Sequence, residues 1–502
     1  MTICFNIKNS DIAYTNKKDY RYEIESLTRL FFPCAKIDVV YDDSCTDSEV
    51  IRIGIERGEK TTCLHVCVCL DKGDDLQSKK MLDNDISDYE TECERLLCIM
   101  LYKLLSEKVG RAPQWGILTG IRPVKLLNSY KSMGKTDKQV RELLKTNYLV
   151  SNKKLDMAFK IADIQENVIK DRDPKDYSLY ISIPFCPSRC SYCSFVSHSI
   201  EKQKKYIGDY VNCLCKELEH TAKIAKEQDL KLKTVYMGGG TPTSLEAEQI
   251  ARILKCVKDN FDFTHLQEFT VEAGRADTIT REKLQVIKDA GVERISINPQ
   301  SFNDSVLKAV GRKHSVQDVV DCYNMAREIG FKSINMDLIA GLPTDTVDSF
   351  KNSVNSAISL CPENITVHTL SIKRSSDLYP HDTRQASIYQ NPVREMVDYS
   401  SDTLIKNEYA PYYLYRQKNT AENLENIGYS KENKICLYNI YIMEEIHTII
   451  AVGAAGVTKL VNPYKKQINR IANYKFPHEY INDFNEMINR KNSIGEFYEK
   501  LV

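Results

Sequence analysis

The sequence has no run of about eighteen apolar residues, and its N-terminal stretch lacks the basic segment followed by an apolar one that marks an export signal. These absences argue against a membrane-spanning helix and against secretion. Net charge is also missing, because 69 Lys and Arg balance 69 Asp and Glu. No overall field therefore attracts nucleic acid or an anionic membrane, and an anionic ligand has to be held by local charges. We expect a cytoplasmic protein that binds neither nucleic acid nor a membrane.

Cysteine, by contrast, is plentiful, with 17 in 502 residues. Because cytosolic thiols are kept reduced, we expect no disulfide scaffold. Most of the cysteines are expected to be small buried core residues. Two groups could be metal ligands, but their alternation with Leu and Val favours a strand or helix core: CLHVCVC (Cys63, Cys67 and Cys69) and CLC (Cys213 and Cys215).

The length of 502 residues is too great for one ordinary domain. A charged, proline-bearing segment at 171–176, DRDPKD, is typical of a linker. We predict an α+β domain over 1–165, where the strand-like segments VIRIGIE and CLHVCVCL are accompanied by helical patterns. A core domain is predicted over 172–375. The remaining residues, 376–502, have a mainly helical, tyrosine-rich pattern, and we expect them to cover the substrate site.

The predicted core domain alternates short strand-like segments with longer amphipathic ones. This rhythm predicts a parallel sheet with helices outside it. Fewer units occur than the eight of a closed barrel, so the fold class is α/β, a partial (β/α)6 TIM-type barrel or a barrel with two degenerate units. Chemistry in such folds gathers at the carboxyl ends of the strands. The six strand-like segments are 177–183, 233–239, 268–274, 294–300, 332–341 and 364–372.

Directly after the first predicted strand, Cys186, Cys190 and Cys193 form the pattern C-x3-C-x2-C. A zinc site normally takes four protein ligands, and His198 is the nearest candidate for a fourth. A 4Fe-4S cluster held by three thiolates instead keeps one iron open for another ligand. Both kinds of site remain open at this point, and the position of the triplet at a strand end favours the cluster.

A cysteine triplet on the first β-to-α loop, with an aromatic residue before its last member, resembles the radical S-adenosylmethionine (SAM) superfamily. The segments YISIPFC, GGGTPTSL, GVERISINPQSF and NMDLIAGLP are similar, in order and approximate spacing, to the oxygen-independent coproporphyrinogen III oxidase family. QWGILTGIRPVKLL and YYLYRQKNTAENLENIGYS resemble its HemZ-type coproporphyrinogen dehydrogenase branch. The resemblance thus extends over most of the chain.

This resemblance implies a 4Fe-4S cluster on the three cysteines and one or two molecules of SAM. The residues that match those of the family around the methionyl group are Gly238, Gly239, Gly240 and Thr241 for its ammonium side and Arg312 for its carboxylate. A charge-assisted bond from such an arginine contributes about 1.5 to 3 kcal/mol. The alternatives without a role in binding are a tight turn for the glycines and a surface position for the arginine.

The same resemblance places Glu272, Gln300 and Asp337 around the ribose hydroxyls, each at or beside a strand end. Capping or interstrand hydrogen bonds are the alternative for them. Tyr180 matches a catalytic tyrosine that lies against the cluster and the cofactor, with a core aromatic as the alternative.

The activity implied is oxygen-independent oxidative decarboxylation of coproporphyrinogen III propionates to vinyl groups by a 5′-deoxyadenosyl radical, which gives protoporphyrinogen IX in haem biosynthesis. A flavodoxin- or ferredoxin-type electron donor and an electron acceptor of unknown kind are implied as partners. Two rival functions are a haem chaperone of the HemW type and a radical SAM enzyme that acts on haem itself.

A tetrapyrrole with four propionates needs local cations in a protein without net charge. Tyrosines near the predicted barrel mouth could supply a flat surface or hydrogen bonds, and a solvated charged face is the alternative. The candidates are Lys373, Arg374, Arg416 and Lys418 as cations, with Tyr412, Tyr413 and Tyr415 beside them.

Overall fold

The chain forms two compact units, which are described separately. Among the described residues, the first comprises 1–160 and 416–425, and the second comprises 161–378, 392–415 and 426–501. Within these ranges no helix has both the length and the apolar character needed to cross a bilayer. The computed structural model describes residues 1–9, 20–33, 35–41, 47–70, 74–170, 172–195, 197–373, 376–378, 392–417, 420–465 and 467–501.

The first unit is built on a five-stranded sheet in the order β2-β1-β3-β4-β5. β1 is parallel to both of its neighbours, whereas β3, β4 and β5 are antiparallel. The strands are β1 (Thr2–Asn9), β2 (Asp38–Val40), β3 (Val50–Arg57), β4 (Thr61–Cys69) and β5 (Leu76–Asp83). The helices are α1 (Arg21–Phe31), α2 (Tyr89–Val109), α3 (Pro123–Ser132), α4 (Asp137–Tyr148) and the first part of α5 (Asn152–Lys170).

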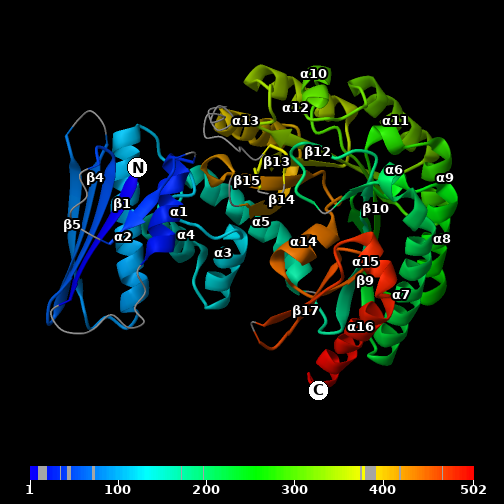
Figure 1. Ribbon diagram of the computed structural model, residues 1–502, viewed down its shortest axis with the longest axis horizontal. Helices are drawn as coiled ribbons and strands as arrows, with labels where there is room; N and C mark the ends of the chain where they lie inside the picture. Colours follow the sequence, from blue (N-terminus) through cyan, green and yellow to red (C-terminus); the bar gives the residue numbers. More distant parts are fainter. Residues whose placement is uncertain are drawn as a thin grey trace. The chain divides into compact units, whose positions relative to one another are not determined.

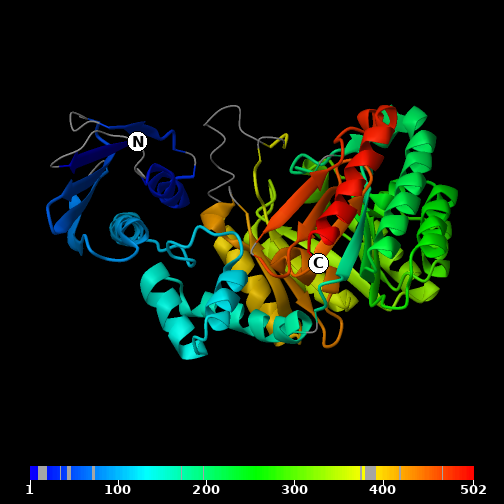
Figure 2. The same cartoon turned by 90° about the horizontal axis from the view of Figure 1, so that it is seen from below.

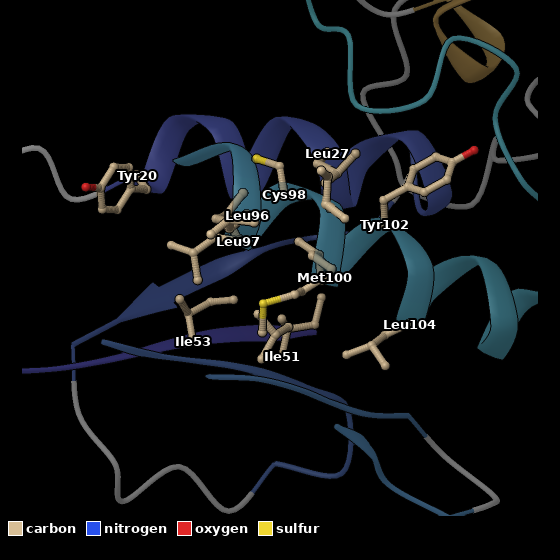
Figure 3. Close-up of a cluster of buried hydrophobic side chains, with 14 of the residues drawn as sticks. Tyr20, Leu27, Ile51, Ile53, Leu96, Leu97, Cys98, Met100, Tyr102 and Leu104 are labelled. Carbon is tan, nitrogen blue, oxygen red and sulfur yellow. The ribbon is translucent and has the colours of Figure 1, made fainter. Parts of the chain in front are cut away.

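Helices α1 and α2 cover one face of this sheet, where the core of the unit lies. Figure 3 shows Ile51 and Ile53 of β3 lying beneath Leu97 and Met100 of α2. In β4 the alternation sends every second side chain to this core, namely Leu64, Val66 and Val68.

The cysteines of β4 lie on its other face, because successive side chains of a strand point to opposite sides. Cys63, Cys67 and Cys69 are half-buried there, out of phase with the buried Leu and Val residues. The expectation that these cysteines belong to the core is therefore wrong. The described cysteines are all free thiols, as expected.

The second unit contains a sheet in the order β14-β15-β13-β12-β11-β10-β9-β6-β16-β17-β18. Its centre is formed by the six predicted strands, which are parallel to one another from β6 to β13. Their residues are buried almost throughout, as in strands covered on both faces. The predicted α/β class is confirmed. The six strands are β6 (Asp176–Ile183), β9 (Lys231–Gly239), β10 (Glu268–Gly274), β11 (Arg294–Ile297), β12 (Ser333–Ala340) and β13 (Asn364–Thr369).

Amphipathic helices follow these strands and line the outside of the sheet (Figure 1). Their ends carry the expected signals, as in α11, where Ser315 and Asp318 form a capping box and Gly330 ends the helix with a φ of 93°. The helices are α7 (Ile207–Glu227), α8 (Ala247–Asn260), α9 (Arg281–Asp289), α10 (Asp304–Ala309), α11 (Val316–Ile329) and α12 (Val347–Leu360).

The C-terminal segment carries the expected helices but also extends both edges of the sheet. β16 pairs in parallel with β6, and β15 pairs antiparallel with β13. Helix α16 packs against α7 at the outside (Figure 2). The segment comprises α13 (Val393–Lys406), β14 (Ala410–Arg416), β15 (Glu425–Ser430), α14 (Leu437–Glu444), β16 (Thr448–Val452), β17 (Val457–Val461), β18 (Ile468–Ala472), α15 (Pro477–Asn482) and α16 (Phe484–Glu499).

Candidate active site at the strand ends

The predicted site residues gather at the carboxyl ends of the parallel strands of the second unit. β6 leads into a cysteine loop, 184–195, and β9 ends in a glycine loop, Gly238–Thr241. Because β6, β9 and β10 are parallel neighbours, their carboxyl ends meet at one edge of the sheet. Glu272, at the end of β10, belongs to the same edge.

The cysteine loop is closed by a short parallel bridge between β7 (Phe185–Cys186) and β8 (His198–Ser199). Burial raises the pKa of the Cys186 and Cys193 thiols, and the neighbouring cysteine charges raise it further. The three cysteines are thus close enough to interact electrostatically. Cys186 Sγ also lies 3.4 Å from Thr241 Oγ1 in the glycine loop.

The three sulfurs are not gathered as ligands of a single ion would be. Zinc at about 2.3 Å from each thiolate would place the sulfurs about 3.8 Å apart. Within the described part of the chain, Cys186, Cys190 and Cys193 do not form a group whose ligand atoms all lie within 4.8 Å, and neither does any set with His198. In a 4Fe-4S cluster each thiolate binds a different iron, so the three sulfurs do not have to meet around one point. The three thiols are therefore not arranged as ligands of a single zinc ion.

The glycine loop is hydrogen-bonded to the cysteine loop through the backbone. Gly240 N–H donates to Ile183 O, and Thr241 N–H donates to Phe185 O, both at 2.7 Å. A Cβ on Gly240 would lie 2.5 Å from Phe185 O. Gly239 has a φ of 110°, which favours glycine. The close approach of the two loops is thus enough to explain why glycine occupies positions 239 and 240.

Glu272 borders the same loop, since a Cβ on Gly238 would lie 2.8 Å from its carboxylate. Its Oε1 accepts a hydrogen bond of 2.5 Å from the Tyr236 hydroxyl. Burial raises the pKa of Glu272 to about 7, and the Asp337 charge adds to this effect. Hydrogen bonds from Tyr236 and from the Gly239 backbone act in the opposite direction. Glu272 therefore titrates close to neutral pH.

Two arginines lie beside the cysteine loop. Arg275 donates to Ser188 O at 3.0 Å and to Cys190 Sγ at 3.6 Å, and it is paired with Asp277. Arg312 donates to Asn298 O at 2.6 Å. Such cations favour thiolate over thiol. Arg275 was not predicted, although it directly follows the strand end in EAGR.

The Arg312 guanidinium also contacts the aromatic residue that precedes the last cysteine. Its Nε and Nη2 lie 3.2 and 3.1 Å from the Tyr192 hydroxyl. The structure thus places Arg312 at the cysteine loop and gives it protein partners there, and its contact with the methionyl carboxylate stays a prediction.

In β11 and the residues that follow it, three polar side-chain oxygens are buried without a hydrogen-bond partner among the described residues. Buried polar groups are normally hydrogen-bonded, and a run of unpaired acceptors indicates the place of a ligand with donors. The atoms are Ser296 Oγ, Asn298 Oδ1 and Gln300 Oε1.

Gln300 is held in a left-handed backbone conformation, with a φ of 66°. Its N–H donates to Asp337 O at 2.8 Å, and its carbonyl accepts from Ile339 N–H at 2.9 Å. Strain of this kind costs about 1 to 3 kcal/mol and is concentrated at functional sites. β12 therefore fixes the orientation of Gln300.

Asp337 lies on β12 beside Gln300 and is itself hydrogen-bonded. Asn335 Nδ2 donates to its Oδ1 at 2.8 Å, and His368 Nε2 lies 3.8 Å from its Oδ2. Burial raises the pKa of Asp337, but His368 and Asn335 outweigh burial, so the pKa lies below its usual value. Asp337 is a carboxylate at neutral pH.

Tyr180 is part of a stack of three tyrosines on the inner side of the sheet. Its ring centroid lies 6.3 Å from that of Tyr236 and 6.1 Å from that of Tyr438, and the latter two lie 4.3 Å apart. Burial raises the pKa of the Tyr180 phenol, so it is protonated. Tyr236 and Tyr438 were not predicted as site residues, because tyrosine in strands and helices is common in cores.

Arg416 does not serve as the substrate cation that the sequence suggests. In the first unit its guanidinium donates to Leu118 O at 2.5 Å and to Asn423 O at 2.7 Å, and it lies 5.4 Å from the Trp115 ring centre. Burial lowers the pKa of Arg416 to about 10. The Arg416 side chain thus hydrogen-bonds backbone carbonyls of its own unit.

The remaining substrate candidates are distributed over different environments. Lys373 is half-buried, whereas Arg374 and Lys418 lie outside the described residues. Tyr412 and Tyr413 are buried in the second unit, and the Tyr415 hydroxyl lies 3.4 Å from His368 Nδ1, next to Asp337. Tyr415 is thus the candidate of this group that the structure brings to the strand-end site.

Comparison with known proteins identifies the family of the chain. Residues 180–357 match the Radical SAM superfamily. The chain is 38% identical to the "Oxygen-independent coproporphyrinogen-III oxidase-like protein HemZ" of Bacillus subtilis, over 84% of this chain and 86% of that protein. The chain belongs to the HemZ family of radical SAM proteins.

Two further relatives of this HemZ-family chain carry different names. It is 34% identical to "Heme chaperone HemW" of Bacillus subtilis, over 60% of this chain and 77% of that protein. Among solved structures, coproporphyrinogen III oxidase (HemN) from Escherichia coli, a radical SAM enzyme, is similar with 22% identity, a TM-score of 0.49 and coverage of 65% of this chain and 73% of that chain.

As a member of the radical SAM superfamily, the chain takes a 4Fe-4S cluster and SAM as cofactors. The strand-end site fits both groups. The three thiols are not gathered around a single point, which is compatible with the cluster, and the unpaired buried oxygens of Asn298 and Gln300 suit a ligand with hydroxyl and ammonium donors.

Proposed function

We propose that this protein catalyses oxygen-independent oxidative decarboxylation of coproporphyrinogen III propionates to vinyl groups, giving protoporphyrinogen IX in haem biosynthesis in the cytoplasm. The observation that carries the proposal is the extent of the similarity to HemZ, which covers 84% of the chain and so includes the regions on both sides of the radical SAM core. The HemW relative covers 60%.

In this proposal, Cys186, Cys190 and Cys193 hold the cluster, with Arg275 hydrogen-bonded to Cys190. The bound cofactors supply a 5′-deoxyadenosyl radical, formed when an electron from the cluster cleaves SAM. The carboxylates of Glu272 and Asp337 and the amide of Gln300 accept hydrogen bonds from the ribose hydroxyls. Gly238 to Thr241 and Arg312 hold the methionyl end.

The chain's own residues position the substrate and exclude water. Tyr180, Tyr236 and Tyr438 are stacked on one another, and Tyr180 and Tyr236 are half-buried whereas Tyr438 is buried. We propose that the tetrapyrrole lies against the accessible part of Tyr180 and Tyr236, beside the carboxylate of Glu272. Of the four cations predicted to bind a propionate, Arg416 is engaged elsewhere and two lie outside the described residues. Lys373 is therefore the one that we assign to a propionate.

Each propionate that becomes a vinyl group releases carbon dioxide, one proton and two electrons. With both cofactors bound, the substrate hydrogen would go to the deoxyadenosyl carbon, and an external acceptor would take the remaining electron. A flavodoxin- or ferredoxin-type donor would resupply the electron used to cleave SAM. Two such events convert coproporphyrinogen III to protoporphyrinogen IX.

A second candidate function is haem binding and delivery, and the similarity to "Heme chaperone HemW" at 34% identity favours it. The chaperone function would use the same core without decarboxylation. The two functions differ in product and in stoichiometry.

The test is an anaerobic assay of the full chain reconstituted with iron and sulfide, supplied with SAM, a low-potential electron donor and coproporphyrinogen III. The proposal predicts tetrapyrrole products that have lost one and then two carboxyl groups, detected by mass spectrometry. The Cys190→Ala variant should form neither these products nor 5′-deoxyadenosine. Deoxyadenosine formation without vinyl products, together with one haem bound per chain, would instead establish the chaperone function.

A further inference from the structure

The outer face of β4, opposite the core of the first unit, carries a thiol-rich row. Here His65, Cys67 and Cys69 alternate with the core residues of the same strand. All three side chains are half-buried. Helices α1 and α2 lie on the opposite face of the sheet (Figure 3), so these thiols are not part of the packed core.

Cys67 and Cys69 lie beside a carboxylate. Their sulfurs are 3.5 Å apart. The two sulfurs and an oxygen of Asp75, which precedes β5, all lie within 4.8 Å of one another. Within the described part of the chain, no other set of three His, Cys, Asp or Glu ligand atoms is this close. Tetrahedral zinc with bonds of about 2.3 Å to sulfur and about 2.0 to 2.2 Å to oxygen needs ligand atoms at about this separation.

The surroundings supply charge compensation. Two thiolates and a carboxylate would leave a divalent ion with one excess negative charge. Arg52 of β3, which is opposite Cys67 in the sheet, donates from Nη1 to Cys69 Sγ at 3.1 Å. Its guanidinium can offset that charge and fix the orientation of the sulfur, as the outer partners of metal ligands do.

A candidate fourth ligand, His65, precedes Cys67 by two residues on the same strand and lies outside the group of three. His65 is opposite Lys79 of β5, and Cys67 is opposite Gln77. The His65 ring nevertheless contacts Gln77, with Nε2 3.3 Å from Gln77 Oε1. The ring therefore leans along the strand toward Cys67.

We propose that Cys67, Cys69 and Asp75 form a binding site for a thiolate-preferring transition metal ion such as Zn2+, with His65 or water as the fourth ligand. The ligand set of two sulfurs, an oxygen and an imidazole nitrogen matches the zinc preference for S, N and O donors. The site lies in the first unit and is separate from the strand-end site. It does not depend on the proposed decarboxylation.

A disulfide is the competing use of two neighbouring thiols. Alternate residues of a strand are about 6.6 to 6.8 Å apart between Cα atoms. This separation is at the upper limit for an unstrained disulfide, about 6.8 Å. A disulfide would therefore strain the strand, whereas metal binding would leave the backbone as it is, and for this reason we favour metal binding.

The test uses the full chain with Cys186, Cys190 and Cys193 all changed to Ala, so that the other thiolates cannot bind metal. Reduced protein is titrated with Co2+, whose thiolate charge-transfer absorption reports sulfur ligation, and Zn2+ is counted by mass spectrometry after desalting. One ion per chain is expected. Cys67→Ser and Cys69→Ser should lose the absorption, and Asp75→Asn should weaken binding about tenfold or more.

The matched control is Cys63→Ser, because Cys63 is on the same face of β4 but outside the group. It should bind one ion as before. A second measurement needs no variant at these positions: Zn2+ should protect Cys67 and Cys69 from alkylation, mapped by peptide mass, while Cys63 stays reactive. The proposal would be overturned if Zn2+ did not change the alkylation of Cys67 and Cys69, or if the Cys67→Ser protein bound as much metal as its parent. It would also be overturned if Cys67 and Cys69 formed a disulfide and the reduced protein took up no metal.

Discussion

The Tyr236 hydroxyl donates a hydrogen bond of 2.5 Å to Oε1 of Glu272, across the neighbouring strands β9 and β10. This pair joins the tyrosine stack to the carboxylate at the strand-end site. Burial nevertheless dominates the environment of Glu272 and raises its pKa from 4.5 to about 7.

Because the pKa of Glu272 is higher in the folded than in the unfolded chain, the free energy of unfolding depends on pH in a predictable direction. Between pH 4.5 and about 7, Glu272 binds more protons in the folded than in the unfolded chain. The free energy of unfolding therefore decreases as pH rises through this window. Chemical denaturation of the apo protein should show that Glu272→Gln lacks this part of the slope, and Tyr236→Phe should extend the window to higher pH. An identical slope in Glu272→Gln and wild type would contradict the assignment.

Gly240→Ala should disturb the contact between the glycine loop and the cysteine loop. The added Cβ would lie 2.5 Å from Phe185 O and 2.9 Å from Ile183 O, and backbone atoms have to move. We expect a loss of about 1 to 3 kcal/mol in the free energy of unfolding and less iron retained per chain after anaerobic reconstitution and desalting.

The control is Gly208→Ala in α7, because a Cβ there meets no heavy atom within 4 Å. This change should leave iron content unchanged and stabilise the helix by about 0.5 to 1 kcal/mol. Wild-type iron content in Gly240→Ala would show that the loop contact does not support the cluster site.

Much of the secondary structure of the second unit could be predicted from the sequence, because the patterns that indicate it lie within short segments. The alternation of β-branched and amphipathic segments is enough to predict the six central strands, and the cysteine triplet marks the end of β6. β16 was missed although its sequence, TIIAV, is rich in β-branched residues, because the whole C-terminal segment was expected to be mainly helical; the strand pairs with β6 and β17.

The partners of site residues could not be predicted in the same way. Arg275 near Cys190 and the stack of Tyr180 with Tyr438 join segments that are distant in sequence. The face of a strand also depends on packing. The alternation in β4 allowed Cys67 to be either inside or outside, and the positions of α1 and α2 decide which.

Gly428→Ala should destabilise the second unit, because the added Cβ would lie 1.8 Å from Tyr413 Cε1. Tyr413 is buried and cannot move its ring without disturbing its neighbours. A loss of about 1 to 3 kcal/mol in the free energy of unfolding is expected. The double variant Gly428→Ala with Tyr413→Leu tests the cause, since the cost of the alanine should be smaller when the ring is absent. The same cost in both backgrounds would assign the effect to the backbone instead.

Lys154 and Glu425 form a buried ion pair in the first unit, with 2.5 Å between Nζ and Oε1. Trp115 Nε1 donates to the other oxygen of Glu425 at 2.7 Å. Lys154→Met removes the buried cation that is hydrogen-bonded to the Glu425 carboxylate and should cost about 3 to 5 kcal/mol in the free energy of unfolding.

Most of that stability should return in Lys154→Met with Glu425→Gln, because glutamine is neutral and its oxygen still accepts from Trp115. Denaturant titration of the single and double variants measures the difference. If the double variant is no more stable than Lys154→Met alone, the buried charge is not the cause.

The central claim is that Cys186, Cys190 and Cys193 hold a 4Fe-4S cluster that leaves one iron open for SAM. The most direct measurement is iron, sulfide and zinc content of the anaerobically reconstituted full chain, followed by reduction in the presence of SAM. We predict about four iron atoms per chain and release of 5′-deoxyadenosine, with both lost when any one of the three cysteines is changed to alanine. Zinc in place of iron, or an intact reduced cluster that leaves SAM uncleaved, would contradict the claim.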